Sequence, residues 1–428
     1  MKWSLFLALL FLFGCGRPDA TPPDKGQPQD LSKAEPGPAA QTLSPIPWEK
    51  AGAKPGWSRV NPDGILEFWD KAKAPADGPP GGIPAFQFES FPPRVEFIDL
   101  PAPINHPWGL DLSRAKITDT ELKTFAEAKE LQNVSTLNLS QAKITDAGLE
   151  YVKGLSHLDA LDLHDATLIT DAGLERLKGL KKLAHLGVIR TQITNDGLKH
   201  LKELPELHTL VLFQTKITDE GLRHVGNLSG LTVLSLGATP ITDEGLKHLQ
   251  GLKNLTKLDL QYTEVKGSGL VYLQEMKQLA DLNLTRLRIT DDGLKNLRDC
   301  VGLVRLELFD TNVTGPGLSH LKDIKGLATL GLSLTKITDD NLKSLADLKG
   351  LTSLDLSQTG ITDRGVEHLK NLQNLTTLDL DDTKITETGL KELKNLKRLT
   401  HLRIHNGKIT ASAAEEFQKA VLGCRVSW

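Results

Sequence analysis

The chain has 428 residues, of which 51 are Lys or Arg and 54 are Asp or Glu, and its formal net charge is −3. This balance lacks the basic surface that nucleic-acid-binding proteins use, so we expect no nucleic-acid partner. Aromatic residues form only 5% of the chain, whereas leucine recurs throughout, which indicates a core built by repetition. A chain of this length forms two or three ordinary domains or one long array.

Residues 1–15 have the pattern of an export signal. Lys2 precedes an apolar stretch from Leu5 to Phe13, which is shorter than the ~20 residues that cross a bilayer and is typical of a signal-peptide core. The motif LFGC at 12–15 resembles the lipobox of bacterial lipoproteins, although Phe13 is larger than the residue usual there. The resemblance implies cleavage before Cys15 and a lipid on that cysteine. The alternative is an ordinary secretory signal, which would make the protein secreted.

Residues 16–55 follow as a linker. They contain nine prolines among Gly, Ala, Gln, Asp and Lys, a composition that stays extended and solvated and reaches roughly 35 Å as a flexible coil. Lipid and linker together predict a tether in the cell envelope. Since Gly16 and not Asp follows Cys15, the lipoprotein resemblance implies the outer membrane or the cell surface rather than the inner membrane.

Residues 56–107 are the segment richest in aromatic side chains after the signal. The sequence NPDG at 61–64, flanked by RV at 59–60 and ILEF at 65–68, predicts a β-hairpin. We interpret this segment as an N-terminal cap on the array that follows, and not as a second functional domain. Its aromatic residues are Trp57, Phe68, Trp69, Phe86, Phe88, Phe91 and Phe97.

Residues 108–428 repeat one unit about thirteen times. The first two intervals between unit openings are 27 and 25 residues, and every later interval is 24, which predicts a solenoid. In one unit, alternating Leu210-Val211-Leu212 predicts a short strand, and Leu222, Val225 and Leu228 recur at helical spacing. The openings are Ile117, Ile144, Ile169, Ile193, Ile217, Ile241, Val265, Ile289, Val313, Ile337, Ile361, Ile385 and Ile409.

The unit resembles the leucine-rich repeat. Residues 207–217 read LxxLxLxxTxI, against L-x-x-L-x-L-x-x-N/C-x-L in that family, with Thr at the Asn/Cys position. The 24-residue unit is similar to the GALA-type repeats of bacteria and to those of F-box receptors and ribonuclease-inhibitor-like proteins. The resemblance implies an α/β horseshoe solenoid with a parallel β-sheet on the concave face and α-helices on the convex face. Residues 417–421 are expected to close the last helix, and an edge strand at 424–426 is expected to cap the C-terminal end.

The motif ITDEG at 241–245 has a structural explanation at each position. Thr242 is placed to cap the helix, and Asp243 lies at the positive end of its dipole. Gly245 is expected to let the turn pack closely against the neighbouring repeat. Acidic pairs such as Asp243-Glu244 lack the alternating ligands of a calcium loop. Two units depart from the motif, at 265–268 and 313–316, which indicates either drift or a functional site.

No catalytic, metal or cofactor motif is present in the sequence, and we expect no enzyme activity, no metal and no cofactor. His401 and His405 lie about 13 Å apart on one predicted strand, too far to share a metal ion. Cys300 and Cys424 replace leucines at core positions about 24 Å apart, and a disulfide needs about 7 Å. We therefore predict two buried free thiols.

Inward-facing strand positions are mostly small or polar, with two exceptions that we predict to bind ligand. Exposed aromatic and arginine side chains are frequent at binding hot spots, and an apolar patch on a polar sheet needs an explanation. An acidic stretch near the C-terminus, at residues 355, 379, 381 and 382, is either solvated or faces a basic partner. The apolar cluster is Ile189, Val211, Phe213 and Val233, and the aromatic–arginine group is Tyr262, Arg286, Arg305, Glu307 and Phe309.

These observations predict a non-enzymatic, extracytoplasmic protein-binding scaffold, tethered to the membrane by a lipidated cysteine, that binds partner proteins on its concave face. The alternatives are a structural or glycan-binding module of the cell envelope, or an inhibitor or receptor of the repeat type. Few aromatic residues lie on the predicted concave face, which argues against glycan binding. An export signal without an F-box segment argues against the inhibitor and receptor roles.

Overall fold

The computed structural model describes residues 49, 52–75, 78–90, 107–127, 133–405 and 407–428. The chain divides into two units, and all of these residues lie in the second, Leu43–Trp428. The predicted signal segment with Cys15, and most of the predicted linker, lie outside the described residues. Among the residues that are described, no helix is long and apolar enough to cross a membrane.

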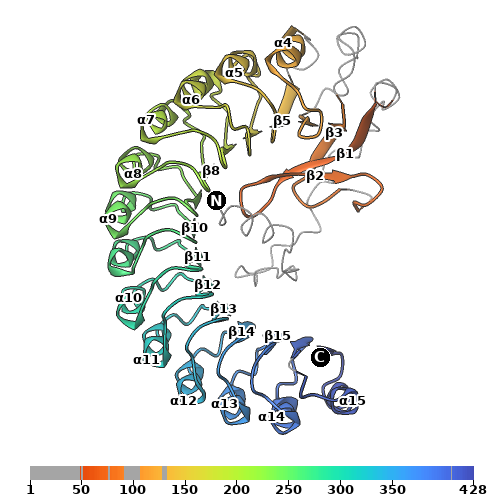
Figure 1. The fold of residues 1–428 in the computed structure, drawn as a ribbon, viewed down its shortest axis with the longest axis vertical. Helices are drawn as coiled ribbons and strands as arrows, with labels where there is room; N and C mark the ends of the chain where they lie inside the picture. The colour runs from red at the N-terminus through yellow and green to blue at the C-terminus, as the bar shows by residue number, and fades with distance from the viewer. Residues whose placement is uncertain (1–48, 50–51, 76–77, 91–106, 128–132, 406) are drawn as a thin grey trace, which may run out of the picture. The chain divides into compact units, whose positions relative to one another are not determined.

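The described residues form one sheet of seventeen strands, and its parallel run from β3 to β17 is the inner layer (Figure 1). From β3 onward each strand pairs in parallel with the next along the chain, and the middle residues of neighbouring strands stay in register. The strands are β1 Ala53–Val60, β2 Leu66–Asp70, β3 Ile83–Phe88, β4 Trp108–Asp111, β5 Val134–Asn138, β6 Ala160–Asp162, β7 His185–Gly187, β8 Thr209–Val211, β9 Val233–Ser235, β10 Lys257–Asp259, β11 Asp281–Asn283, β12 Arg305–Glu307, β13 Thr329–Gly331, β14 Ser353–Asp355, β15 Thr377–Asp379, β16 His401–Arg403 and β17 Arg425–Ser427.

Helices form the outer layer (Figure 1). They are short, and in several repeats the α-helix is continued by a 3₁₀ turn; the repeat at 265–288 has a 3₁₀ helix alone. The α-helices are α4 Asp119–Glu127, α5 Asp146–Val152, α6 Asp171–Arg176, α7 Asn195–Leu198, α8 Asp219–Val225, α9 Asp243–Leu246, α10 Asp291–Lys295, α11 Gly315–Leu318, α12 Asp339–Leu342, α13 Asp363–Leu369, α14 Glu387–Glu392 and α15 Ala411–Ala420. The 3₁₀ helices are η3 Leu177–Gly179, η4 Leu201–Glu203, η5 Lys247–Leu249, η6 Ser268–Leu273, η7 Ser319–Leu321, η8 Lys343–Leu345 and η9 Leu393–Asn395.

A single core runs between the two layers, from Ala53 to Val426. Ile217, Leu222 and Val225 are fully buried in it, and their equivalents in the other repeats are buried as well, as the periodicity predicts. Each repeat buries its leucines against the next repeat, so the array is stable only as a stack. The solenoid predicted from the sequence, with a parallel sheet inside and helices outside, is confirmed.

The predicted hairpin is present at the N-terminal end. β1 and β2 pair antiparallel on either side of a turn at 61–65, and β1 also pairs antiparallel with β3, the first strand of the parallel run. Fully buried Phe86, Trp108 and Phe125 close this end of the core. At the other end, Phe417 of α15 is fully buried and β17 forms the last strand.

A ladder of hydrogen bonds joins the starts of successive helices. The carboxylate of Asp219 accepts the backbone N–H of Thr242 at 2.8 Å and its hydroxyl at 2.6 Å, although Thr242 belongs to the next repeat. The Thr242 hydroxyl in turn accepts the N–H of Glu244 in its own helix. The aspartate of the motif therefore ties two repeats together, besides lying at its own helix dipole. Asp119, Asp146, Asp171, Asp291, Asp339 and Asp363 bond the next threonine in the same way.

The recurrence of glycine at one position of the repeat has a steric cause in this ladder. A Cβ on Gly245 would collide with the carboxylate of Asp219 in the preceding repeat, and Gly197 faces Asp171 in the same way. The close packing that we expected for this glycine is confirmed, and its neighbour is the bonding carboxylate itself.

The departure from the motif at 313–316 is compensated within the next repeat. Gly315 replaces the usual aspartate, and Asn341 replaces the glycine that would face it. The Asn341 side chain fills the space above Gly315 and accepts both the N–H and the hydroxyl of Thr338, at 3.0 and 2.7 Å. The acceptor thus comes from the same repeat instead of the preceding one. This irregularity needs neither drift nor a ligand site to explain it.

Candidate binding face

Fifteen inward-facing residues form one row across the parallel strands, one from each strand. The row divides into two parts according to what lies over it. Its members are Gln87, Asp111, Asn138, Asp162, Gly187, Val211, Ser235, Asp259, Asn283, Glu307, Gly331, Asp355, Asp379, Arg403 and Ser427.

The β1–β2 hairpin crosses the first part of this face. Ser58 on β1 accepts a hydrogen bond from the hydroxyl of Thr136 on β5 at 2.9 Å, and the backbone of Leu66 hydrogen-bonds to the Asp162 carboxylate on β6. Farther along, the turn at 61–65 reaches β8 and β10. We call the strands β5 to β10 the covered part of the face, and β11 to β17 with the turn at Tyr262 the distal part.

The predicted apolar cluster lies under the tip of this hairpin. Ile189, Val211 and Phe213 pack together with exposures of 5%, 2% and 5%, and Ile65 from the hairpin packs against them. Val233 is half-buried beside them. The cluster therefore forms as the sequence predicts, but the expectation that it is exposed is wrong, because a segment 124 to 148 residues away in the sequence covers it.

Gly64 makes the close approach possible. Its φ of +81° lies in the left-handed region, which glycine adopts without strain. A Cβ there would also lie 2.7 Å from both Thr209 and Val211. Both conditions require glycine at this position of the turn.

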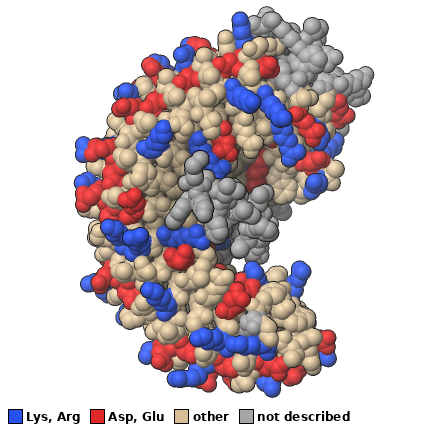
Figure 2. Space-filling view, in the orientation of Figure 1, with Lys and Arg blue, Asp and Glu red and all other residues tan. Residues whose placement is uncertain are grey.

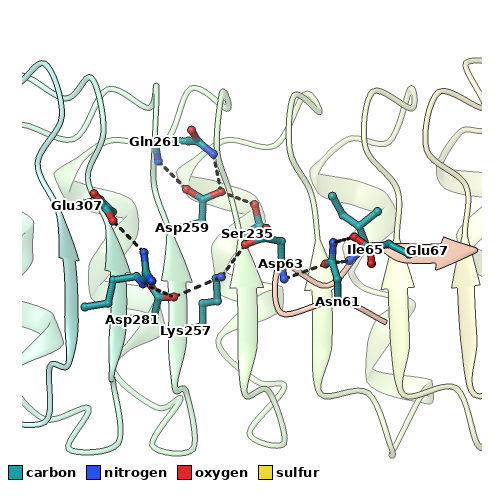
Figure 3. A network of polar contacts seen from close by, with 11 residues as sticks. Asn61, Asp63, Ile65, Glu67, Ser235, Lys257, Asp259, Gln261, Asp281 and Glu307 are labelled. Atoms are coloured by element: carbon teal, nitrogen blue, oxygen red, sulfur yellow. Dashed lines mark hydrogen bonds and ion pairs between the residues drawn. The ribbon is translucent and has the colours of Figure 1, made fainter. Parts of the chain in front are cut away.

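A charged network surrounds the tip (Figure 3). Lys257 on β10 lies 2.7 Å from the Asp63 carboxylate and 3.4 Å from that of Asp281. Asp281 lies 4.0 Å from Arg305, which pairs with Glu307 at 3.1 Å. The network thus leads from the hairpin into the distal part, to two residues predicted as binding residues.

Burial raises the pKa of two carboxylates in the middle of the row, Asp259 and Glu307. Burial raises the pKa of Asp259, while hydrogen bonds from Gln261 and Ser235 lower it. Burial also raises the pKa of Glu307, which Arg305 opposes and the charge of Asp355 reinforces.

The aromatic–arginine group divides into two sets in the structure. The Arg286 guanidinium lies 5.3 Å from the centre of the Tyr262 ring and 5.7 Å from that of Phe309, and it pairs with Asp310 at 3.2 Å. Arg305 and Glu307 form the second set, on β12. All five predicted residues are half-buried.

The first set lies at the edge of the sheet and not on the strands. Tyr262 and Arg286 each have a φ of 58° and follow the ends of β10 and β11. Strand alternation could not predict this, since left-handed backbone costs an L-residue about 1–2 kcal/mol and gives no periodic signal. The same repeat position is left-handed in Lys116, Gln141, Asp165, Arg190, Gln214, Ala238, Asp310, Leu334, Gln358 and Asp382.

The acidic stretch near the C-terminus is partly neutralised within the face. Arg403 lies 3.2 Å from Asp379 and 2.6 Å from Asp381, and His405 lies 2.9 Å from Asp381. Burial raises the pKa of Asp379 to about 6, with a further contribution from Asp355 and Asp381. Sequence reasoning missed Arg403 as a partner, although its position in the same repeat register carries that information.

The cysteines and the possible metal ligands among the described residues show no sign of chemical activity. Cys300 and Cys424 are free and buried, as predicted, and burial raises the pKa of these thiols to about 12 and about 11, which makes them poor nucleophiles. No group of three or more His, Cys, Asp or Glu among the described residues could hold a metal ion. On the surface seen in Figure 2, Lys and Arg are interspersed with Asp and Glu along the helical side.

Comparison with known proteins agrees with this geometry. Sequence profiles of the leucine rich repeat match residues 349–409, and separately residues 130–152 and 251–273. The array is a leucine-rich repeat solenoid. Repeats of this kind generally mediate contacts between proteins and typically act as non-enzymatic scaffolds. No curated protein matches the chain in sequence.

Several solved structures are similar to this solenoid. An internalin (inlF) of Listeria monocytogenes is 23% identical, with a TM-score of 0.46, over 66% of this chain and 93% of its own. A leucine-rich repeat protein of Leptospira interrogans is 20% identical, with a TM-score of 0.48, over 80% and 93%. An internalin C2 of Listeria monocytogenes is 24% identical, with a TM-score of 0.37, over 49% and 83%.

Proposed function

We propose that this leucine-rich repeat protein is a non-enzymatic, extracytoplasmic scaffold that binds a partner protein on the distal part of its concave face. A lipid on Cys15 and the linker at 16–55 tether it to the cell envelope, at the outer membrane or the surface. The 24-residue unit with a helix in each repeat supports a GALA-type or ribonuclease-inhibitor-like repeat class.

The observation that carries the binding proposal is the placement of Arg286 between two aromatic rings. Tyr262, Arg286 and Phe309 are half-buried, are of types enriched at protein interfaces, and lie at the edge of the sheet. No described segment crosses the face from β11 to β17. A preformed surface of this kind lowers the entropy lost on association.

The helical side offers less to a small-molecule ligand. Two hollows of about 540 Å³ lie between the loops of neighbouring repeats. Both are open to solvent and are lined mainly by lysine and polar side chains, among them Lys349, Lys370, Lys199 and Lys202. Ligand pockets are usually concave and mostly apolar, so these hollows favour neither a substrate nor a cofactor.

Capture from an envelope extract tests the binding face. The immobilised protein is compared with Arg286→Glu plus Phe309→Asp, and with Lys295→Glu on the exposed side of α10 as a charge-changing control. We expect a partner that is retained by the wild type and by the control and lost from the double variant, with circular dichroism unchanged. Equal capture by all three proteins would contradict the distal site.

Membrane fractionation tests the tether. We expect Cys15→Ala to move the protein from the membrane fraction to the soluble envelope fraction. Palmitate labelling and globomycin-sensitive processing should both be lost in the same variant. A full-length, unprocessed product in the cytoplasm would refute the tether.

A further inference from the structure

The hairpin tip and the surface beneath it have the character of a ligand and its site. Ile189, Val211 and Phe213 form a cluster of their own, separate from the continuous core of the array. The leucines of the repeats belong to that continuous core and not to the cluster beneath the tip. The array therefore does not depend on the tip of the hairpin for its own core.

The site side is a preformed platform. The ring of Phe213 lies over Gly237 of the next repeat, where a Cβ would stand 2.6 Å from the ring. Val211 and Ile189 complete the apolar surface, and Lys257 stands at its rim. Lys257 also pairs with Asp281 at 3.4 Å, so the lysine keeps an anionic neighbour if the tip departs.

The ligand side is a turn that holds its own shape. The Asn61 side chain accepts the N–H groups of Asp63 and Ile65 at 2.9 and 3.0 Å, and the backbone N–H groups of Asn61 and Gly64 close the turn at 2.8 and 2.9 Å. The side-chain amide of Asn61 donates a hydrogen bond to the Glu67 carboxylate at 2.7 Å. All of these bonds join residues within the hairpin, so they support the shape of the turn without any contact to the array.

The contacts between the hairpin tip and the platform resemble those of a protein–protein interface. One branched apolar side chain, Ile65, contacts the centre of the platform, and one carboxylate, Asp63, pairs with a largely buried lysine at the rim, where Lys257 is 16% exposed and Asp63 42%. An apolar centre with a polar rim is the usual anatomy of a protein–protein interface. Figure 3 shows the pair between Asp63 and Lys257 at the end of the hairpin.

We propose that the platform formed by Ile189, Val211, Phe213 and Lys257 is a recognition site for a β-turn, and that the N-terminal hairpin is its intramolecular, autoinhibitory ligand. The partner that fits is a protein loop with an acidic residue two positions before a branched aliphatic one, separated by glycine, as in Asp63-Gly64-Ile65. Such a loop competes with the hairpin for the platform. This site differs from the distal part and does not depend on the binding proposed there.

Tethering explains why the site is occupied at rest. A segment of the same chain has an effective concentration of about a millimolar or more at a site that it can reach. A partner loop of equal intrinsic affinity is therefore outcompeted unless it is abundant or makes further contacts. Weakening the tip should raise the affinity for a loop supplied in trans, because the apparent dissociation constant falls as the competent fraction rises.

A cyclic peptide tests this directly. The peptide carries residues Arg59–Phe68, RVNPDGILEF, closed through its ends, with the turn verified by NMR. It is titrated into the full chain and into a tip variant with Asp63→Ala plus Ile65→Ser, and binding is followed by calorimetry. We expect at least tenfold tighter binding to the tip variant than to the wild type.

Charge reversal gives the test its specificity. Adding Lys257→Glu to the tip variant should weaken the peptide at least tenfold, and a peptide with Asp63→Lys should recover binding to that protein. Adding Phe309→Ala in the distal part should change nothing. Equal affinity for the wild type and the tip variant, no binding to either, or binding indifferent to Lys257 would each overturn the proposal.

Hydrogen exchange covers the case in which the tip variant does not fold. In the wild type, excess cyclic peptide should accelerate exchange of the Leu66 amide, which hydrogen-bonds to Asp162, while amides of β10 to β16 keep their protection. Unchanged exchange at saturating peptide would also overturn the proposal.

Discussion

The covered and distal parts of the concave face share one repeat, one register and one sheet, but they differ in what surrounds their inward residues. In the covered part, Val211 and Phe213 are buried at 2% and 5% exposure by a segment from outside the repeats. In the distal part, Phe309 occupies the same repeat position as Phe213, four repeats later, and stays half-buried. Position within a leucine-rich repeat therefore does not determine whether a residue is available to bind.

The charges differ in the same way. In the covered part, Lys257 is satisfied across the face by Asp63 of the hairpin. In the distal part, Arg305 and Arg403 are satisfied by carboxylates of the array itself. The segment that crosses the face adds a pair to the hairpin beside the pair that Lys257 makes with Asp281 of the array, and this added pair makes the occupancy of the face measurable by mutation.

The largest difference between the two parts is expected when Phe213 and Phe309, which share one repeat position, are each replaced by alanine. Phe213→Ala removes a ring that is buried beneath the hairpin and leaves a cavity there, so we expect a loss of about 3 kcal/mol in the free energy of unfolding. Phe309→Ala removes a half-buried ring at the edge and should cost about 1 kcal/mol. Urea denaturation of both variants measures the difference. Equal losses would mean that the hairpin does not cover Phe213 in solution.

The swap at Gly315 and Asn341 gives the next largest effect. Gly315→Asp alone places a carboxylate where the Asn341 side chain already lies, and we expect a cost of about 2 kcal/mol. Asn341→Gly alone removes the acceptor of Thr338 and introduces glycine into a helix, at about 1–2 kcal/mol.

The double variant restores the arrangement of the other repeats, with an aspartate in one repeat bonding the threonine of the next. It should therefore be within about 0.5 kcal/mol of the wild type, which a double-mutant cycle by urea denaturation measures. Additive losses would show that the compensation seen between these two positions is not energetic.

The sequence predicts the regular features of this molecule well and the irregular ones poorly. The strand at 209–211, the buried Ile217 and the hairpin turn at 61–64 follow from periodicity and turn chemistry, which act over a few residues. The contact of Ile65 with Val211 joins positions 146 residues apart, and no local pattern encodes that meeting. The hairpin was therefore interpreted as an end cap alone.

The candidate site shows the same limit. The sequence identified Tyr262, Arg286 and Phe309 as a group, because their types are unusual on a polar sheet, and the structure brings these three together. It placed them on the strands, since the left-handed turn that carries Tyr262 and Arg286 has no glycine to mark it. The acceptor role of Asn341 was missed because it follows from a substitution in the preceding repeat.

In the distal part, Asp379 should make the free energy of unfolding depend on pH. Its pKa of about 6 in the folded protein exceeds the ordinary value of 3.8, so the folded state binds the extra proton between about pH 4 and 6. The stability contributed by this group is full below about pH 4 and is lost as the pH rises through 6. Asp379→Asn should flatten that part of the profile and stabilise the protein at pH 7 by about 1–2 kcal/mol.

Arg403 keeps Asp381 as a partner in this variant, so the change isolates one carboxylate. Unfolding free energies from urea titrations at pH 4, 5, 6 and 7 give the measurement, with the wild type in parallel. An unchanged slope, or a loss of stability at pH 7, would show that Arg403 holds Asp379 ionised in solution.

The smallest expected stability losses come from removing one ion pair between the hairpin and the array, and one ion pair within the array. Asp63→Asn removes the pair to Lys257, whose nitrogen is largely buried but whose partner is 42% exposed, and we expect about 1 kcal/mol or less. Asp310→Asn removes the pair to Arg286 in the distal part, where the carboxylate is 49% exposed, and should cost about half as much.

The two substitutions should differ more in their effect on the hairpin than in the size of the stability loss. Loss of the Asp63 pair should increase protease cleavage at the hairpin turn, because it joins the hairpin to the array, whereas loss of the Asp310 pair should leave that cleavage unchanged. Limited proteolysis that responds equally to both substitutions would show that the pair with Lys257 does not hold the tip in place.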